Sequence, residues 1–340
     1  MSTPRSRASG PRVLGRVAAA VGIVLLLAGG VGIAAHYSFF AGESVSTAGT
    51  LIASFTPLFL PVTVIALGLL VLSRRRYLAV AAAAVLALGV WTQAPLYWSE
   101  HRAAAAVDSP KVRVMQANIY LGQADTEAVV RTVGDRDVDL LTVSELTDSA
   151  VAGLARAGIS EKLPYSFLRP TAGGGGTGIY SRYPLSGGEV LPGFVLHNLR
   201  ATMDLPGAEP TAVYALHPLP PYPEPAYRWM AELRHLRSIL GSEPNPMIVG
   251  ADFNSTYDHG QYRRILDAGS PILDAAEYVG AGIVATYPAD RRYPAVLAID
   301  RILTRGGTPM SFSRIEIPGS DHHGVIGEIG LGVAPDHDAP

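Results

Sequence analysis

The sequence of 340 residues contains no cysteine and few charged residues. The lack of cysteine excludes disulfide bonds, thiolate-ligated zinc sites and cysteine nucleophiles, although it does not identify the redox compartment. Charged residues make up 16% of the chain and the net charge is -2 at pH 7, so the overall basicity typical of nucleic-acid-binding proteins is missing. A mean hydropathy of +0.23 indicates that a large apolar excess is concentrated somewhere in the chain.

The apolar excess lies in the first hundred residues. Three segments, 17–35, 51–72 and 77–97, carry no charge. Each has about 20 residues, which at 1.5 Å per residue crosses roughly 30 Å of bilayer hydrocarbon. A cleaved signal peptide could account for the first segment but not for three in succession. We therefore predict a membrane anchor over residues 1–98 that contains three transmembrane helices.

The distribution of arginine predicts how these helices are oriented. Four arginines precede the first apolar segment and Arg74–Arg76 separate the second from the third, whereas the 36–50 loop contains neither lysine nor arginine. By the positive-inside rule, the N-terminus and Arg74–Arg76 are cytoplasmic, and everything after Trp98 is extracytoplasmic. Pro57 and Pro61 predict a kink within the second helix.

After the anchor, the composition becomes that of a water-soluble domain. We predict a linker at 99–110, a domain at 111–332 and a short tail at 333–340. Within the domain we expect helices at Thr126–Val133 and Tyr227–Leu240, and strands at Lys111–Gln116, Val138–Val143, Gly178–Ser181, Leu199–Met203, Thr211–Leu216, Pro246–Val249, Val296–Leu303 and Val325–Leu331. Some strands are followed by a helix and others by another strand, which favours packed sheets with outer helices over a single doubly wound sheet.

Polar residues recur at or near the ends of these predicted strands. They are Asn118, Glu145, His217, Asp252, Asn254, Asp321 and His322, whereas a further acid, Asp300, lies inside the predicted strand Val296–Leu303. Polar groups held at strand ends by a rigid scaffold are the usual material of active sites. A carboxylate such as Glu145 suits a hard cation such as Mg²⁺, and a histidine can donate to phosphate or act as a general acid. Taken singly, each also has a structural interpretation as a turn residue, a helix N-terminal acid or a buried pair.

The stretch "GSDHHG" (319–324) adds a possible zinc site, because an acid precedes two adjacent imidazoles. Zinc is disfavoured by the absence of a His-Glu-x-x-His motif and of any thiolate. We expect His323 to be a solvent-facing residue without a role in a site.

Taken in order, Asn118, Glu145, "GTGIYSRYPL", His217, "GADFN", "AIDRIL" and "SDHH" resemble the endonuclease/exonuclease/phosphatase superfamily, the DNase I-like fold, over about residues 111–332. The resemblance implies a four-layer α/β sandwich and phosphoester hydrolysis with a divalent metal, Mg²⁺ or alternatively Mn²⁺. The sequence departs from the family pattern at Ser144, where glutamine is usual, and at Gly324, where proline is usual. Both positions flank the acting residues, so the departures leave the substrate rather than the chemistry open.

The resemblance also implies a role for each polar residue. The implied roles are metal binding by Glu145, Asn118 and Asp321; activation of the attacking water by Asp252; transition-state stabilisation by His322, oriented by Asp300; and contacts to the substrate phosphate by His217, Asn254, Asn118 and Arg200.

The substrate is predicted from the surroundings of these residues. A DNA-cutting surface needs basic residues that follow the phosphates, but Arg291–Arg292 is the most obvious doublet in the domain. The prolines and aromatics of 218–225 and 286–294 suit an apolar or lipid-side ligand. The combination of anchor and domain also resembles the membrane-bound teicoplanin-resistance proteins, which implies a cell-envelope lipid or lipid-linked substrate. A membrane-anchored nuclease and a non-catalytic envelope protein remain as alternatives, and no obligate protein partner is evident.

Overall fold

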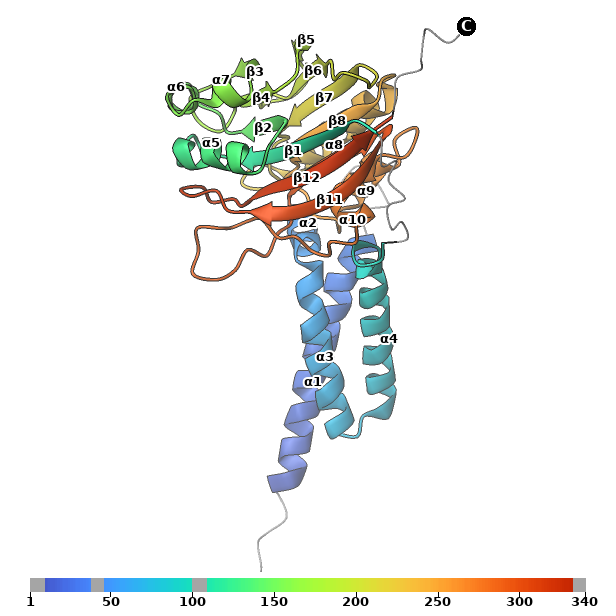
Figure 1. Ribbon diagram of the computed structural model, residues 1–340. Helices are drawn as coiled ribbons and strands as arrows, with labels where there is room; N and C mark the ends of the chain where they lie inside the picture. The colour runs from blue at the N-terminus through green and yellow to red at the C-terminus, as the bar shows by residue number, and fades with distance from the viewer. Residues whose placement is uncertain (1–9, 38–45, 100–108, 333–340) are drawn as a thin grey trace, which may run out of the picture. The chain divides into compact units, whose positions relative to one another are not determined.

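The structure is a computed structural model that describes residues 10–37, 46–99 and 109–332 (Figure 1). The predicted tail, and residues 100–108 of the predicted linker, lie outside these described residues. Two compact units are present, of which the first contains residues 10–37 and 48–94 and the second contains residues 46–47 and 95–332.

The first unit consists of apolar helices. They are α1 (Gly10–Tyr37), α2 (Thr47–Ser54), the 3-10 turn η2 (Thr56–Leu58), α3 (Phe59–Leu72) and α4 (Arg76–Gln93). The spans Val13–Tyr37 and Arg76–Leu96 are each long and apolar enough to cross a membrane. Segments Thr47–Ser54 and Thr56–Leu72 would make a third span if the pair, bent by 63°, is counted as one.

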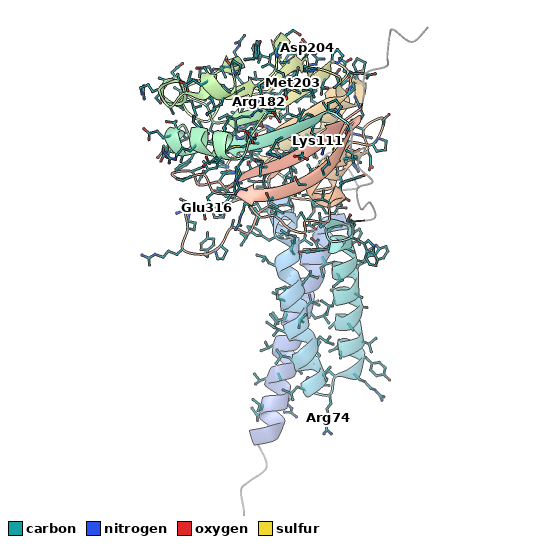
Figure 2. All side chains as sticks on the ribbon, in the orientation of Figure 1. Arg74, Lys111, Arg182, Met203, Asp204 and Glu316 are labelled. Atoms are coloured by element: carbon teal, nitrogen blue, oxygen red, sulfur yellow. The ribbon has the colours of Figure 1, made fainter. Side chains whose placement is uncertain are left out.

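The bend in this pair follows from its sequence. Pro57 lies in the first turn of η2, where its missing N–H needs no acceptor, and the chain restarts as helix α3 at Phe59. The predicted kink is therefore present as a break between two helices. Arg74 lies in the turn between α3 and α4, as Figure 2 shows.

Small residues allow the apolar helices to pack closely. A Cβ added at Gly29 would lie 2.2 Å from Thr63 Oγ1, and one at Gly32 would lie 2.1 Å from the ring of Phe59. Close backbone approach at glycine is a common way for helices to associate in lipid. Large apolar side chains such as Leu27, 65% exposed, point outward from the unit.

The second unit contains two six-stranded sheets. The first has the spatial order β11 (Gly307–Ile315), β12 (Gly324–Leu331), β1 (Lys111–Asn118), β2 (Leu140–Ser144), β4 (Thr177–Ser181), β3 (Tyr165–Arg169). The second has the order β5 (Leu185–Val190), β6 (Leu199–Met203), β7 (Thr211–Leu216), β8 (Met247–Asp252), β10 (Asp300–Arg305), β9 (Leu273–Asp274).

The two sheets pack face to face. Val112 and Val114 of β1 share one buried apolar cluster with Val213 of β7 and Ile248 of β8. Met115, on the opposite side of β1, joins a second cluster instead, as expected when successive side chains in a strand alternate between faces. The inner faces of both sheets therefore form the central core.

Helices cover the two outer faces (Figure 1). The first sheet is covered by α5 (Thr126–Asp135), α6 (Asp148–Arg156) and α7 (Ile159–Lys162), and the second by α8 (Ala226–Ser242) and α9 (Gly260–Leu266). A short helix, α10 (Ala275–Tyr278), follows β9. The order of helix, sheet, sheet and helix is the predicted four-layer α/β sandwich.

Strand direction collects the polar residues at one edge of the sandwich. Strands β1 and β2 are parallel, with Asn118 opposite Ser144, and β7 and β8 are also parallel. Strand β10 runs antiparallel to β8, so its first residue, Asp300, lies opposite Asp252. At the other end of the first sheet lie Lys111, which begins β1, and Arg182, which follows β4 (Figure 2).

Candidate active site

Asn118 connects the two sheets at this edge. Its buried side-chain amide donates one hydrogen bond to Glu145 Oε1, at 3.2 Å, and another to Asp252 Oδ2, at 3.0 Å. The Asn118 Oδ1 atom accepts from the backbone N–H of Tyr120. One side chain at the end of β1 thus fixes the positions of carboxylates that belong to different sheets.

Glu145 follows β2 and is held in an unusual backbone conformation. Its φ angle is +62°, in the left-handed region that is uncommon for residues other than glycine and often marks a functional site. Its Oε2 atom accepts from the backbone N–H of Leu121 at 2.7 Å. The carboxylate is partly exposed, so it can reach a ligand at the surface of the site.

Asp321 lies close enough to Glu145 for the two carboxylates to influence each other. Burial raises the pKa of Asp321 to about 6; His322 opposes this effect, and the charge of Glu145 adds to it. Among the residues that the structure describes, Asp321 Oδ1 is buried without a hydrogen-bond partner. Two adjacent carboxylates, one with an unsatisfied oxygen, form an arrangement that a divalent cation would stabilise.

Asp252 lies between two imidazoles. Its Oδ2 atom is 3.7 Å from His217 Nε2 and 3.8 Å from His322 Nε2. Burial and the nearby Asp300 raise the pKa of Asp252, whereas the two imidazoles lower it. A carboxylate whose affinity for protons is increased in this way can accept one from a bound water.

The imidazole of His322 is oriented by contacts on several sides. Its Nδ1 atom lies 2.9 Å from Asp300 Oδ2, and its ring packs on that of Tyr287 with centroids 4.8 Å apart. Burial favours the neutral ring, but Asp300 and Asp252 outweigh it and raise the pKa of His322 to about 10. Ligand atoms of Asp252, Asp300 and His322 all lie within 4.8 Å of one another, which is a second place where a metal could bind.

His217 and Asn254 are fixed by loop contacts. The backbone N–H of His217 donates to Asn198 Oδ1 at 2.8 Å. Asn254 also has a positive φ, +49°, and its Nδ2 donates to the carbonyl oxygen of Pro218 at 3.1 Å. Both side chains therefore reach the same edge as Asp252.

Arg200 is the predicted site residue that the structure does not bring to this group. It lies in β6, and its Nε donates to Glu243 Oε2 at 2.8 Å, with Glu243 buried just after helix α8. The same carboxylate oxygen accepts from Tyr214 Oη at 2.6 Å. Because its guanidinium belongs to this ion pair over the outer face of the second sheet, the substrate-binding role predicted for Arg200 does not fit the geometry.

Several residues that the sequence did not single out support the site. Ser320 Oγ donates to the carbonyl oxygen of Asn118 at 2.7 Å and accepts from the N–H of His322. Thr286 Oγ1 accepts from the N–H of Asp300 at 3.3 Å, and its carbonyl oxygen accepts from the N–H of His323. Ser320 lies in the "GSDHHG" stretch and Thr286 lies before Tyr287, but nothing in the sequence marks Asn198.

His323 was expected to face solvent, and its ring is partly exposed. Partial burial and the charge of Arg314 lower the pKa of His323. The hydrogen bond of His323 is made by its backbone N–H, and in the described structure its ring makes none with the group around Asp252.

Known proteins resemble this chain in sequence pattern and in fold. The Endonuclease/Exonuclease/phosphatase family model matches residues 115–322, whereas a search of curated proteins found no match. Two similar structures are of TDP2 from D. rerio: a form humanized by 14 mutations (17% identity, TM-score 0.55) and a complex with single strand DNA product (18%, 0.54). Each covers 65% of this chain and 99% of the other chain.

A third similar structure is an endonuclease/exonuclease/phosphatase from Beutenbergia cavernae, with 18% identity and a TM-score of 0.51. It covers 65% of this chain and 72% of that chain. At these identities the similar structures establish the fold, and the match over residues 115–322 establishes the family. This chain belongs to the endonuclease/exonuclease/phosphatase family.

Proposed function

We propose that this protein is a membrane-tethered phosphoester hydrolase whose site acts outside the cytoplasm on a cell-envelope lipid or lipid-linked phosphate. Membership of the family makes the chain a metal-dependent hydrolase of the phosphodiesterase, phosphatase or nuclease type. The observation that carries the proposal is the convergence of Asn118, Glu145, Asp252, Asp300 and His322 at one edge of the two sheets.

We assign the divalent cation, Mg²⁺ or Mn²⁺, to Glu145 and Asp321, with Asn118 beside them. Hard cations prefer oxygen ligands, and Asp321 Oδ1 is buried without a partner among the described residues. The alternative group at Asp252, Asp300 and His322 is less suitable because Asp300 and Asp252 favour the protonated imidazole of His322, which has no lone pair for a cation. A bound cation would polarise the phosphoryl group and neutralise charge on its oxygens.

Asp252 is proposed to accept the proton of the attacking water. Its Oδ2 atom is held by Asn118 and its Oδ1 atom by the N–H of Asn254, so the carboxylate has a fixed direction. As the water oxygen forms its bond to phosphorus, its proton passes to Asp252 Oδ2, and the bond from phosphorus to the ester oxygen breaks. The released alkoxide takes a proton from solvent and leaves as the alcohol.

His217 and His322 are proposed to bind the phosphoryl oxygens on either side of that water. Both Nε2 atoms lie within 3.8 Å of the same Asp252 oxygen. Because Asp300 favours the protonated form of His322, its Nε2–H can donate to an oxygen on which negative charge develops. Asn254 is proposed to contact the same phosphate.

The membrane location and the substrate class are supported by the sequence. Apolar helices precede the domain, and the arginine distribution predicts that residues after Trp98 are extracytoplasmic. This combination, together with its likeness to the membrane-bound teicoplanin-resistance proteins, supports a proposed role in resistance to glycopeptide antibiotics.

The proposal is tested on the purified full-length chain in detergent with Mg²⁺, Mn²⁺ or EDTA. Polyprenyl phosphate, phospholipid and single-stranded DNA are supplied in parallel. Asp252→Ala, His322→Ala and Glu145→Ala should each lower kcat by about a hundredfold or more. The matched control is Asp204→Ala, which removes an exposed carboxylate that follows β6 at the end of the strand remote from His217. Full activity of the Asp252 and His322 variants would contradict the mechanism, and preferred cleavage of DNA would identify a nuclease instead.

A further inference from the structure

The Glu145 side of the site is bordered by three loops that contain no Asp, Glu, Lys or Arg. They are residues 119–124, 170–177 and 190–197, which we together call the uncharged wall. The first loop follows β1, the second precedes and begins β4, and the third connects β5 to β6. All three therefore belong to the scaffold that positions the reacting groups.

Hydrogen bonds from backbone N–H groups connect these loops to their surroundings. One joins the first loop to Glu145, and others join the second loop to Leu146 and to the third loop. The N–H of Leu121 donates to Glu145 Oε2, and the N–H of Leu146 donates to the carbonyl oxygen of Gly176 at 2.9 Å. The N–H of His197 donates to the carbonyl oxygen of Gly175 at 2.8 Å. The wall is thus a continuous surface beside the carboxylate to which we assign the cation.

The wall presents apolar atoms next to that carboxylate. Leu121 is 43% exposed although its backbone is bound to Glu145. A Cβ added at Gly174 would lie 3.4 Å from Leu121 Cδ2 and 3.7 Å from Glu145 Cδ, and one at Gly175 would lie 3.1 Å from Thr171 Oγ1 and 3.9 Å from Leu196 Cδ2. The two glycines therefore leave a strip between the two leucines that carries one side-chain hydroxyl, that of Thr171, and this strip leads to Glu145.

We propose that the uncharged wall binds the apolar chain of a lipid-linked phosphoester whose phosphate lies at Asp252 and His322. A single-stranded nucleic acid needs cationic side chains along its backbone, and these three loops supply none. Burial of apolar surface is favourable by about 25 cal/mol per Å², so a hydrocarbon chain gains affinity on such a strip. This inference rests on the proposed function, and it assigns Leu121 and Leu196 as residues that determine chain-length specificity.

The test compares two phosphate esters with the same headgroup, one with a long polyprenyl chain and one with a short chain, on the full-length protein. Leu121→Ser and Leu196→Ser are each expected to lower the ratio of kcat/KM for the long over the short ester by about fivefold or more. The matched control is Tyr165→Ser, because Tyr165 is 41% exposed but pairs with Ser181, at the end of β4 remote from Glu145. This control should leave the ratio unchanged.

Binding of a non-hydrolysable long-chain phosphonate is measured for the same variants. If the leucine variants had the same kcat/KM ratio and the same Kd for the phosphonate as the parent, the proposed role of the uncharged wall would be wrong. If binding depends on chain length and on Leu121 but no phosphoester is hydrolysed, the binding role of the wall is supported and the proposed hydrolase function is wrong. If both leucine variants are weakened equally toward the long and the short ester, the effect is structural and the specificity role is wrong.

Discussion

His322 is the residue whose chemistry depends most on its neighbours. Asp300 bonds to one ring nitrogen, Asp252 faces the other, and the ring of Tyr287 lies beside the imidazole at an interplanar angle of 42°. The buried imidazole would be neutral without the two carboxylates, because burial disfavours its charged form. Asp300 therefore serves His322 in two ways, by fixing the ring orientation and by retaining the proton on it.

The raised pKa of His322 predicts a dependence of stability on pH in the metal-free protein. The folded-state pKa, about 10, lies above the ordinary value of 6.5. The contact between the imidazolium and Asp300 therefore contributes to stability fully below pH 6.5, and this contribution is lost as the pH rises through about 10. Asp300→Asn is expected to move the titration midpoint of His322 down toward its ordinary value, which NMR of the imidazole resonances in EDTA can follow. A midpoint that stayed near 10 in the variant would exclude Asp300 as the cause.

Single residues show where prediction from sequence succeeds and where it stops. Asn118 and Asp252 were predicted because they follow apolar strands, and a strand end is visible in the sequence. Arg200 was assigned to the site from its resemblance to the strand arginine of the family, but its partner, Glu243, is 43 positions away and follows another element. Asn198 acts on His217 through the backbone, a kind of contact that leaves no pattern in the sequence.

At the scale of elements, helix α8 holds two loops of the site through one side chain. Glu232 is buried, and its Oε1 accepts from the N–H of Val195 at 3.1 Å while its Oε2 accepts from the N–H of Leu219 at 2.8 Å. Leu219 follows His217 by two residues, and Val195 belongs to the uncharged wall. The carboxylate thus connects the helix to both sides of the site.

Glu232→Gln is expected to weaken this connection while keeping the shape of the side chain. One oxygen becomes an NH₂ group, which faces a backbone N–H and leaves it without an acceptor, at a loss of about 1–3 kcal/mol in the free energy of unfolding. Urea denaturation measures the loss. The control is Glu224→Gln, in an exposed pair with Arg228, which should change stability by less than about 0.5 kcal/mol. Equal effects of the two substitutions would show that the hydrogen bonds of Glu232 contribute no more to stability than the exposed pair of Glu224 and Arg228.

The elements themselves were predicted unevenly, for a physical reason. Strand β7 was predicted with its observed ends, Thr211–Leu216. All six of its residues are buried, and such a strand is visible in the sequence as a mostly apolar run. The edge strands β3 and β5 were missed because they are largely exposed, and β5 contains two glycines in "LSGGEV". Strand β10 begins at Asp300 rather than four residues earlier, so Asp300 opens this strand instead of lying inside it.

At the scale of the whole molecule, the apolar helices predict which side of a membrane the site occupies. With three crossings and a cytoplasmic N-terminus, the domain is extracytoplasmic, whereas two crossings would return it to the cytoplasm. The count depends on the pair Thr47–Ser54 and Thr56–Leu72, which is bent by 63° and makes the third crossing if it is counted as one span. A reporter enzyme that is active only outside the cytoplasm, fused after the last residue, should be active. Activity of a cytoplasmic reporter in the same place would require two crossings.

The second unit also extends further toward the N-terminus than the predicted boundary at 111. Leu96 is 3% exposed within the same core cluster as Trp229, and its carbonyl oxygen accepts from the N–H of Gly282 at 2.7 Å. A Cβ added at Gly282 would lie 2.5 Å from the ring of Tyr97, so this glycine allows close packing. Residues 95–99 therefore contribute to the fold of the domain in addition to following the predicted third span.

Fragments with different starting points test this contribution. A fragment of residues 95–332 should be more stable than one of residues 111–332 by about 2–4 kcal/mol, because the shorter fragment loses the buried Leu96 side chain and leaves a cavity beside Trp229. A fragment of residues 100–332, which keeps the predicted linker but lacks Leu96, should resemble the shorter one. Thermal unfolding of the three fragments, together with Leu96→Ala in the longest, gives the comparison. If the midpoint followed the presence of residues 100–110 instead of Leu96, the linker and not the 95–99 segment would complete the core.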